Sequence, residues 1–312
     1  MTPHFPPYNF YLNSLAPTPL VCVQLQPDDP PVWAKLEFLN PSGSTKDRIA
    51  RYILEKAWRE GRLRPGSAVI EASSGSTSIA MALACAQLGL RFIAVMPAGV
   101  SPERVQMIRG FGGETRLIRG GGIAEAIHET ERLAADLDGF LPRQFSNPDN
   151  ALAHQHGTAR EVLEQIPGGA VDAVVSGVGT GGTLVGLYQG CREGGCPARP
   201  VLARPVQITH APEIECCSFS SRIPGVMDCA SAIFQPSSMP DLIRLEIRDE
   251  AALAMTRRLI AAGFPVGPSS GLNFAAALEA ARTHLPPGAA VVTVFPDRME
   301  RYFSTGLFSS AQ

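Results

Sequence analysis

The chain has 312 residues, of which 45% are hydrophobic and 18% are charged, and its formal net charge is −2 at pH 7. This length predicts about two domains or lobes, and the near-neutral charge gives no reason to expect nucleic acid or a membrane surface as a partner. No apolar run reaches the roughly 20 residues of a membrane span, and residues 1–11 lack the basic-then-apolar order of a signal peptide. We therefore expect a cytoplasmic protein.

Strand-like and helix-like patterns alternate along most of the chain. The predicted strands cover residues 32–38, 67–72, 91–96, 115–118, 171–176, 206–209, 242–247 and 290–295. The predicted helices cover residues 46–60, 76–88, 102–111, 123–137, a stretch after 150 that ends near 167, then 181–189, 250–262 and 272–284. This order predicts an α/β fold with right-handed crossovers and largely parallel sheets, two of them given the length, with a boundary near 145–150.

The cysteines do not suggest a disulfide framework, because there are seven of them in a long chain. Five of them lie in one half of the chain near His210: Cys191, Cys196, Cys216, Cys217 and Cys229. Their spacing matches no common zinc pattern. We predict reduced, mostly structural thiols and no metal site.

Reactive amines are scarce in this sequence. Only three of the 27 basic residues are lysines, and one of them, Lys46, follows a Pro/Ser/Gly turn and begins a helical pattern. An amine can form an imine with a carbonyl compound, whereas a guanidinium cannot. Taken alone, Lys46 is better explained as a solvated residue at a helix start.

The first of three polar turns is Ser73-Ser74-Gly75-Ser76-Thr77, between a predicted strand and a predicted helix. Free backbone N–H groups, hydroxyl donors and the helix dipole suit a carboxylate or a phosphate. A helix cap is the alternative, but a cap needs fewer such residues. The turn therefore favours anion binding.

The second turn, at residues 177–183, contains the spacing G-x-G-x-x-G. A dinucleotide site would also need an acidic residue at the end of the next strand, whereas the predicted strand at 206–209 is followed by His210. There is no Walker lysine either. The dense glycines and two threonines better fit one phosphate monoester held by backbone N–H groups.

The third turn, at residues 268–271, carries Ser269 just before a predicted helix. A serine here can cap the helix or offer a neutral hydroxyl to a heteroaromatic nitrogen, and the cap is favoured when the turn is considered alone. In combination, one scarce lysine, a phosphate site, a carboxylate site and a neutral hydroxyl are what a pyridoxal phosphate enzyme acting on amino acids requires.

With these features the chain resembles the cysteine synthase (O-acetylserine sulfhydrylase) and cystathionine β-synthase family of fold type II pyridoxal phosphate enzymes, over nearly its whole length. The matching segments are residues 35–37, 40–48, 71–77, 144–148, 176–183, 269–271 and 300–305. Residues 32–33 and 297–298 are closer to the B-type isozyme. The resemblance implies a tryptophan synthase β-like fold of two three-layer lobes. Residues 1–40 and 150–312 would form a larger cofactor-binding lobe, and residues 41–149 a smaller mobile one.

The resemblance also implies roles for individual residues. Lys46 would hold the cofactor as an imine and, once released, move the Cα proton. The cofactor would also contact Ser76, and Ser269 would face its ring nitrogen. The cofactor phosphate would be bound by Gly179, Thr180, Gly181, Gly182 and Thr183. The substrate carboxylate would be bound by Ser73, Ser74, Thr77 and Gln144. A homodimer is implied, as is a site for the C-terminal tail of serine acetyltransferase.

The implied reaction is β-replacement on an O-activated L-serine, either O-acetylserine or O-phosphoserine, with sulfide, through an aminoacrylate intermediate to L-cysteine. Ser76 stands where the family usually has asparagine, and residues 210–239 lack the expected glycine-rich segment. Arg222 or Arg298 could meet an anionic leaving group, although surface positions are favoured for both. Four alternatives remain. The protein could be a cysteine desulfhydrase, a cystathionine-forming enzyme, a β-replacement enzyme of secondary metabolism that uses another nucleophile, or a non-catalytic regulatory binder.

Overall fold

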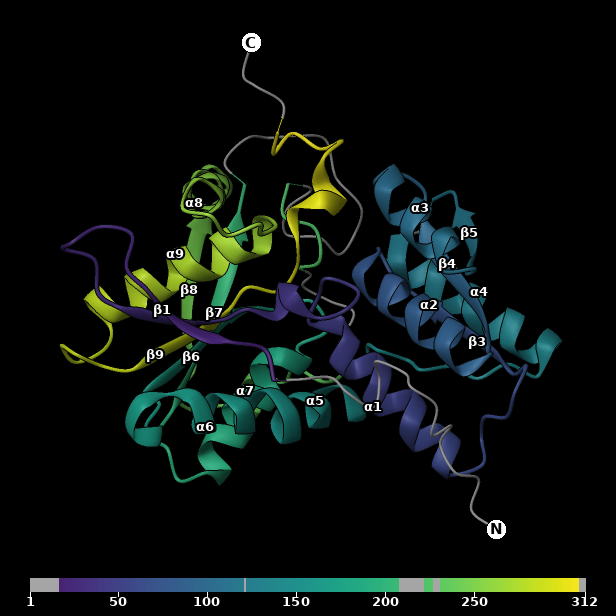
Figure 1. The fold of residues 1–312 in the computed structure, drawn as a ribbon, viewed down its shortest axis with the longest axis horizontal. Helices are drawn as coiled ribbons and strands as arrows, with labels where there is room; N and C mark the ends of the chain where they lie inside the picture. Colours follow the sequence, from purple (N-terminus) through teal and green to yellow (C-terminus); the bar gives the residue numbers. More distant parts are fainter. Residues whose placement is uncertain (1–16, 121, 208–221, 227–230, 309–312) are drawn as a thin grey trace.

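The computed structural model describes residues 17–120, 122–207, 222–226 and 231–308, and it contains two β-sheets with helices packed around each (Figure 1). The larger sheet has the strand order β1-β2-β9-β6-β7-β8. Its strands are β1 (Leu20–Val23), β2 (Val32–Lys35), β6 (Ala173–Gly177), β7 (Arg199–Val206), β8 (Ile243–Arg248) and β9 (Val291–Val294). Only the β1–β2 pair is antiparallel; the other neighbours run parallel.

The smaller sheet is wholly parallel, in the order β3-β4-β5. It consists of β3 (Ala68–Ala72), β4 (Arg91–Pro97) and β5 (Glu114–Ile118). Three helices accompany it: α2 (Ser76–Leu88), α3 (Pro102–Gly110) and α4 (Gly122–Leu137). Every residue of β3 is buried, which explains why its sequence is nearly continuously apolar rather than alternating.

The larger sheet is covered on both faces (Figure 1). On one side lie α8 (Asp249–Ala261) and α9 (Pro268–Thr283), and on the other lie α5 (Asp149–Ala153), α6 (Arg160–Gln165) and α7 (Gly182–Glu193). Helix α1 (Lys46–Arg59) runs between the two sheets and packs against both α2 and α5. The α/β class with largely parallel sheets is thus confirmed, whereas the division into a fixed and a mobile lobe stays a prediction.

The predicted helix before residue 167 is not a continuous α-helix. It begins as α5, continues as a π-helical turn over His154–Ala159 and ends as α6. Glycines of α7 let this segment approach closely, since a Cβ at Gly186 would lie 2.4 Å from the carbonyl oxygen of Ala151. The π turn determines where the His154 side chain lies, which matters for the site described below.

Two other sequence predictions need correction. The strand predicted at 206–209 is β7, which covers Arg199–Val206; residues 208–209 lie outside the described part of the chain. Pro200 and Pro205 concealed it, because proline cannot donate to a ladder and argues against an interior strand. The helix predicted to begin at residue 272 starts at Pro268, so Ser269 belongs to the first turn of α9.

Candidate active site

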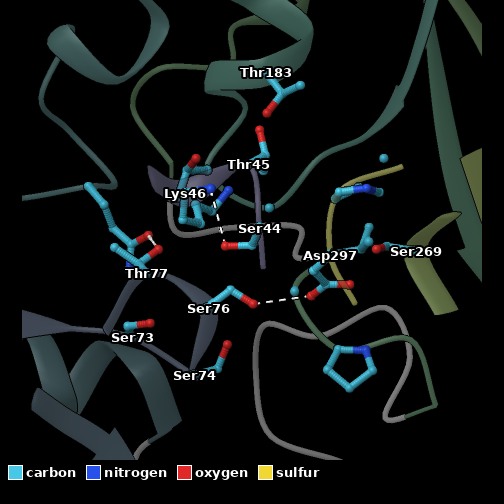
Figure 2. A pocket seen from close by; sticks show the side chains of 18 of the residues that line it. Ser44, Thr45, Lys46, Ser73, Ser74, Ser76, Thr77, Thr183, Ser269 and Asp297 are labelled. Atoms are coloured by element: carbon cyan, nitrogen blue, oxygen red, sulfur yellow. Dashed lines mark hydrogen bonds between the residues drawn. The ribbon is translucent and has the colours of Figure 1, made fainter. Parts of the chain in front are cut away.

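A cleft lies where the carboxyl ends of β3, β6 and β9 meet the amino ends of α1, α2, α7 and α9 (Figure 2). Ligands bind at this edge in parallel α/β proteins, because helix N-termini converge there. The four helix ends present partial positive charge and unpaired N–H groups, so the cleft favours an anionic ligand. All the predicted site residues line this cleft except Gly182.

Lys46 is the first residue of α1, and its side chain enters the cleft. Burial lowers the pKa of its ammonium, while the negative charges of Asp297 and Glu37 oppose that shift. Among the described residues, no ion pair is formed by its amine. A lysine in this state loses its proton at lower pH than a solvated one, as a reactive amine requires.

The turn that carries Lys46 is held from two sides. The carboxylate of Asp47 accepts hydrogen bonds from the backbone N–H of Ser42, at 3.0 Å, and from the Ser42 hydroxyl. Burial raises the pKa of Asp47 to about 6. The guanidinium of Arg301 donates to the carbonyl oxygens of Ser42, at 2.8 Å, and Gly43, at 3.1 Å. These contacts fix the start of α1 and with it the origin of the Lys46 side chain.

The predicted carboxylate site is built around Gln144. Its side-chain oxygen accepts a hydrogen bond from the Thr77 hydroxyl at 2.6 Å, and its side-chain nitrogen donates to the carbonyl of Ala72 at 2.6 Å. The Ser73 hydroxyl accepts a hydrogen bond from the N–H of Gly75 at 3.0 Å. The side chains thus hold one another in place, and the first N–H groups of α2 face the cleft without intrahelical acceptors.

A buried acid lies directly behind this site. Glu71 accepts hydrogen bonds from the backbone N–H groups of Ala72, at 3.0 Å, and Gln144, at 3.2 Å. Its burial in β3 raises its pKa to about 8, because the surrounding apolar side chains disfavour the charged form. Glu71 is therefore mostly protonated at neutral pH and supports Gln144 without bringing a full negative charge close to a bound anion.

The predicted phosphate site is the turn that leads from β6 into α7. Gly179, Thr180, Gly181 and Thr183 line the cleft. Gly182 lies behind the turn, where a Cβ would come within 1.9 Å of the side-chain oxygen of Asn150. Only glycine allows this approach, so Gly182 shapes the turn rather than facing the ligand.

Two side chains missed by the sequence analysis support this turn. The Asn150 side-chain nitrogen donates to the hydroxyl of Thr180, at 2.9 Å, and to the carbonyl of Gln144, at 2.8 Å, and so links the two anion sites. His154 shares a hydrogen bond of 3.3 Å with the Thr183 hydroxyl. Burial lowers the pKa of His154 to about 3, so its ring is neutral at physiological pH.

Thr45 adds a further hydroxyl at the phosphate site. Its Oγ1 is buried and has no hydrogen-bond partner, and Figure 2 shows the hydroxyls of Thr45 and Thr183 pointing toward one another. A buried polar atom without a partner is costly, so a bound group that hydrogen-bonds here would be stabilising. The space between these hydroxyls suits a phosphate at the N-terminus of α7.

Ser269 and Ser76 differ in how free their hydroxyls are. Ser269 lines the cleft from the first turn of α9, where a neutral hydroxyl can meet a ring nitrogen. The Ser76 hydroxyl already donates to the Asp297 carboxylate at 3.1 Å, as Figure 2 shows, and it accepts a hydrogen bond from Arg301 at 2.9 Å. Its only donor is used within the protein, so Ser76 could contact a ligand only through its remaining lone pair.

The two arginines considered in the sequence analysis lie away from the cleft. Arg222 pairs with Glu250 at 2.6 Å, and Arg298 pairs with Glu300 at 2.5 Å. The arginine that lines the cleft is Arg104, at the start of α3, and no motif singled it out. Asp297 and Tyr302, which also line the cleft, fall in or beside segments that matched the family but were given no role.

No metal-binding cluster of histidine, cysteine or acidic residues occurs in the described part of the chain. Cys191 and Cys196 are buried and free, whereas Cys216, Cys217, Cys229 and His210 lie outside the described residues. Within the same described ranges, no helix is long and apolar enough to cross a membrane.

The residues present fit pyridoxal phosphate. Lys46 supplies an amine with a lowered pKa, the α7 turn and the unpartnered Thr45 hydroxyl suit a phosphate, and Ser269 suits the ring nitrogen. When bound, this cofactor supplies an electron sink for chemistry at the α and β carbons of an amino acid.

Comparison with known proteins agrees with this fit. The family model for pyridoxal-phosphate dependent enzymes matches residues 12–297. A cysteine synthase of Staphylococcus aureus is 36% identical over 299 residues, which cover 94% of each chain. The O-ureido-L-serine synthase of Streptomyces lavendulae is 35% identical over 317 residues, covering 97% of this chain and 93% of that one.

Solved structures are similar at the same level. A crystal structure of O-ureido-L-serine synthase has a TM-score of 0.85 at 33% identity and covers 98% of this chain and 97% of its own. The O-acetylserine dependent cystathionine β-synthase of Helicobacter pylori also has a TM-score of 0.85, at 31% identity, covering 96% and 99%. The chain belongs to the family of pyridoxal-phosphate dependent enzymes and is a cysteine synthase-like member that catalyses β-replacement or β-elimination.

Proposed function

We propose that this enzyme acts on an O-activated L-serine, either O-acetyl-L-serine or O-phospho-L-serine, and adds sulfide to give L-cysteine. The observation that carries the proposal is the position of the Lys46 amine, which enters one cleft with two separate anion-binding helix ends. One of these ends suits a cofactor phosphate and the other the α-carboxylate of an amino acid. The similarity to cysteine synthase supports sulfide as the nucleophile.

The residues of the cleft would divide the work. The first N–H groups of α2, with Ser73, Ser74, Thr77 and Gln144, would bind the α-carboxylate and orient the amino acid. Lys46 would take the proton from Cα, a transfer that its lowered pKa favours. With that proton removed and the electron sink that the cofactor would supply, the bond to the β-oxygen would break and the leaving group, acetate or phosphate, would depart.

Ser269 bears on the outcome of the reaction. A hydroxyl does not stabilise a protonated pyridine as a carboxylate would, so electrons are directed toward loss of the β-substituent rather than stored in the ring. This chemistry favours elimination and replacement over transamination. The smaller sheet carries the α2 end of the site, and its closure on the bound carboxylate would exclude water.

A second candidate is β-replacement with another nucleophile. The specific observation is the near-equal similarity to O-ureido-L-serine synthase, at 35% identity against 36% for cysteine synthase. On either candidate we expect a cytoplasmic homodimer, and the cleft would also be the place for an acetyltransferase tail.

The test is product analysis with the purified holoenzyme. O-acetyl-L-serine is supplied with sulfide, hydroxyurea, L-homocysteine or no nucleophile, and the amino-acid products are identified by mass spectrometry. Cysteine formed with a kcat/KM well above that of the other products supports the proposal. If O-ureido-L-serine or cystathionine is the preferred product, then hydroxyurea or L-homocysteine is the nucleophile in place of sulfide. If no product forms with any nucleophile, the proposed function is overturned.

A further inference from the structure

Arg104 is an unusual arginine because it is 6% exposed and lines the cleft. Its guanidinium lies over the ring of Tyr302, 5.1 Å from the centroid. One of its terminal nitrogens donates to the carbonyl oxygen of Ser74 at 3.4 Å, a long hydrogen bond. Its Nε is buried and has no hydrogen-bond partner among the residues that the structure describes.

The contrast with another buried arginine defines what Arg104 lacks. Arg301 is 1% exposed, donates three hydrogen bonds of 2.8–3.1 Å and lies 3.8 Å from a carboxylate oxygen of Asp297. Throughout the described residues, no carboxylate forms an ion pair with Arg104. A buried cation without an anion is costly, so a ligand that supplies one would bind favourably here.

The Arg104 side chain occupies space that is open because residue 75 is glycine. A Cβ at Gly75 would lie 2.3 Å from Cδ of Arg104, so the arginine occupies space that any other residue at position 75 would take. At the start of α3, the Ser101 hydroxyl donates to the carbonyl of Arg301 at 2.9 Å, and Glu103 accepts hydrogen bonds from Ser304 at 2.8 Å. The guanidinium is thus held at the wall of the cleft.

Arg104 does not lie at the predicted α-carboxylate site. The Gly75 N–H donates to Ser73, and in a trans peptide the Ser74 carbonyl points the opposite way, toward Arg104. Arg104 therefore lies on the other face of this turn, on the side of Tyr302 and Asp297. Asp297 lies on that side, and its Oδ2 already accepts hydrogen bonds from Ser76 and Tyr302.

We propose that Arg104 is a specificity-determining residue that binds a second anionic group, a carboxylate or phosphate on the β-substituent of the bound amino acid. The inference rests on the proposed function, because it takes the α-carboxylate site as given. A guanidinium matches both groups through paired N–H donors, whereas a neutral acetyl group would leave those donors without a charge. The enzyme would then accept O-phospho-L-serine or a carboxylate-bearing analogue better than its neutral counterpart.

The binding test compares two amino acids that differ only in side-chain charge. Calorimetry with the holoenzyme measures the binding affinities of L-aspartate and L-asparagine. The proteins compared are the wild type, Arg104→Met, Arg104→Lys and a control, Arg109→Met, which changes an exposed arginine of the same helix. The kinetic arm compares kcat/KM for O-phospho-L-serine and O-acetyl-L-serine. In Arg104→Met we expect the affinity or the kcat/KM for the anionic compound of at least one pair to fall about tenfold or more. The value for its neutral counterpart should stay within about twofold of wild type.

The two arms identify the anion, since the aspartate pair reports a carboxylate and the phosphoserine pair a phosphate. Arg104→Lys keeps the positive charge but lacks the paired N–H donors of a guanidinium, so it should recover part of the lost affinity or kcat/KM for the anionic compound. Arg109→Met should have the same values as wild type. Equal weakening of anionic and neutral members, or a wild type with no preference in either pair, would overturn the proposal. The wild-type comparison decides even if Arg104→Met fails to fold. If the enzyme makes no cysteine but still binds L-aspartate better than L-asparagine, the proposed function is wrong and the role of Arg104 stands.

Discussion

Lys35 is fully buried and Lys46 is half-buried, and burial lowers the pKa of both, yet their surroundings differ. Lys35 is 0% exposed, lies 2.8 Å from a carboxylate oxygen of Glu161 and donates to the carbonyl of Thr18 at 2.5 Å. Lys46 enters the cleft, and its amine forms no ion pair within the described residues. Of these two lysines, Lys35 has its charge balanced, whereas the amine of Lys46 has no ion-pair partner in the part of the chain that the structure describes.

The difference shows how the fold separates a structural from a reactive lysine. Around Lys35, Arg48 bridges Glu37, at 2.6 Å, and Glu161, at 2.6 Å, so four charged side chains balance one another. Around Lys46, helix ends and hydroxyls line the cleft, and the charges of Asp297 and Glu37 raise the pKa of its amine without forming an ion pair among the described residues. An ammonium at Lys46 therefore lacks the ion-pair partner that an ammonium at Lys35 has.

The largest expected effect follows from removing the free amine. Lys46→Ala should lower kcat/KM by at least about 10³-fold, because both the covalent attachment and the proton transfer are lost. Steady-state kinetics with O-acetyl-L-serine and sulfide would measure this loss. A variant that retains more than a tenth of the wild-type activity would contradict the role given to Lys46.

Removing the balanced lysine should have the opposite profile. Lys35→Met keeps the apolar packing and leaves Glu161 paired with Arg48, so we expect a loss of about 1–3 kcal/mol in the free energy of unfolding. Urea denaturation would measure it. Cofactor absorbance and kcat should stay within about twofold of wild type. Loss of the cofactor at unchanged stability would reverse the two roles.

Glu71 extends the comparison to a buried acid without a cation. Burial raises its pKa from 4.5 to about 8, so the folded state retains a proton that the unfolded state releases. The stability that comes from protonated Glu71 is complete below about pH 4.5 and is lost as pH rises through about 8. Between pH 5 and 8 we expect the wild type to lose on the order of 2 kcal/mol that Glu71→Gln does not lose. Parallel pH profiles of the two proteins in denaturation would contradict this.

The smallest expected effect concerns the charge nearest the free amine. Asp297 raises the pKa of Lys46 against the effect of burial. Asp297→Asn should therefore lower that pKa further and move the corresponding limb of the pH profile of kcat, which reports the enzyme–substrate complex in which the Lys46 amine is released, to lower pH by up to about one unit. Tyr302→Phe removes a hydrogen bond to Asp297 but no charge and serves as the control. A shift to higher pH in Asp297→Asn would show that its charge does not act on Lys46.

The sequence revealed those parts of the site that lie within single turns. Lys46, the residues at 73–77 and the glycines at 179–183 stand out because each turn joins a strand to a helix and carries its own hydroxyls and N–H groups. The supporting side chains did not stand out. Asn150, His154 and Arg104 reach the cleft from other elements, and only the folded chain shows what they contact.

The fold was predictable to a similar degree. The α/β order and most helices follow from the sequence pattern, as the interleaved basic and apolar residues of α1 at Lys46–Arg59 show. Strand β7 was misplaced because its two prolines and half-buried arginines hide a pattern that pairing with β6 and β8 stabilises. The π turn at His154 depends on close packing against the glycines of α7, which local sequence does not report.

The central claim is that Lys46, and neither other lysine, holds the cofactor. The sequence has only three lysines, so borohydride reduction of the purified holoenzyme followed by peptide mass mapping gives a direct answer. The account predicts the pyridoxyl phosphate group on the peptide that contains Lys46, with the peptides of Lys35 and Lys56 unmodified. Modification at Lys35 or Lys56 in place of Lys46 would contradict it.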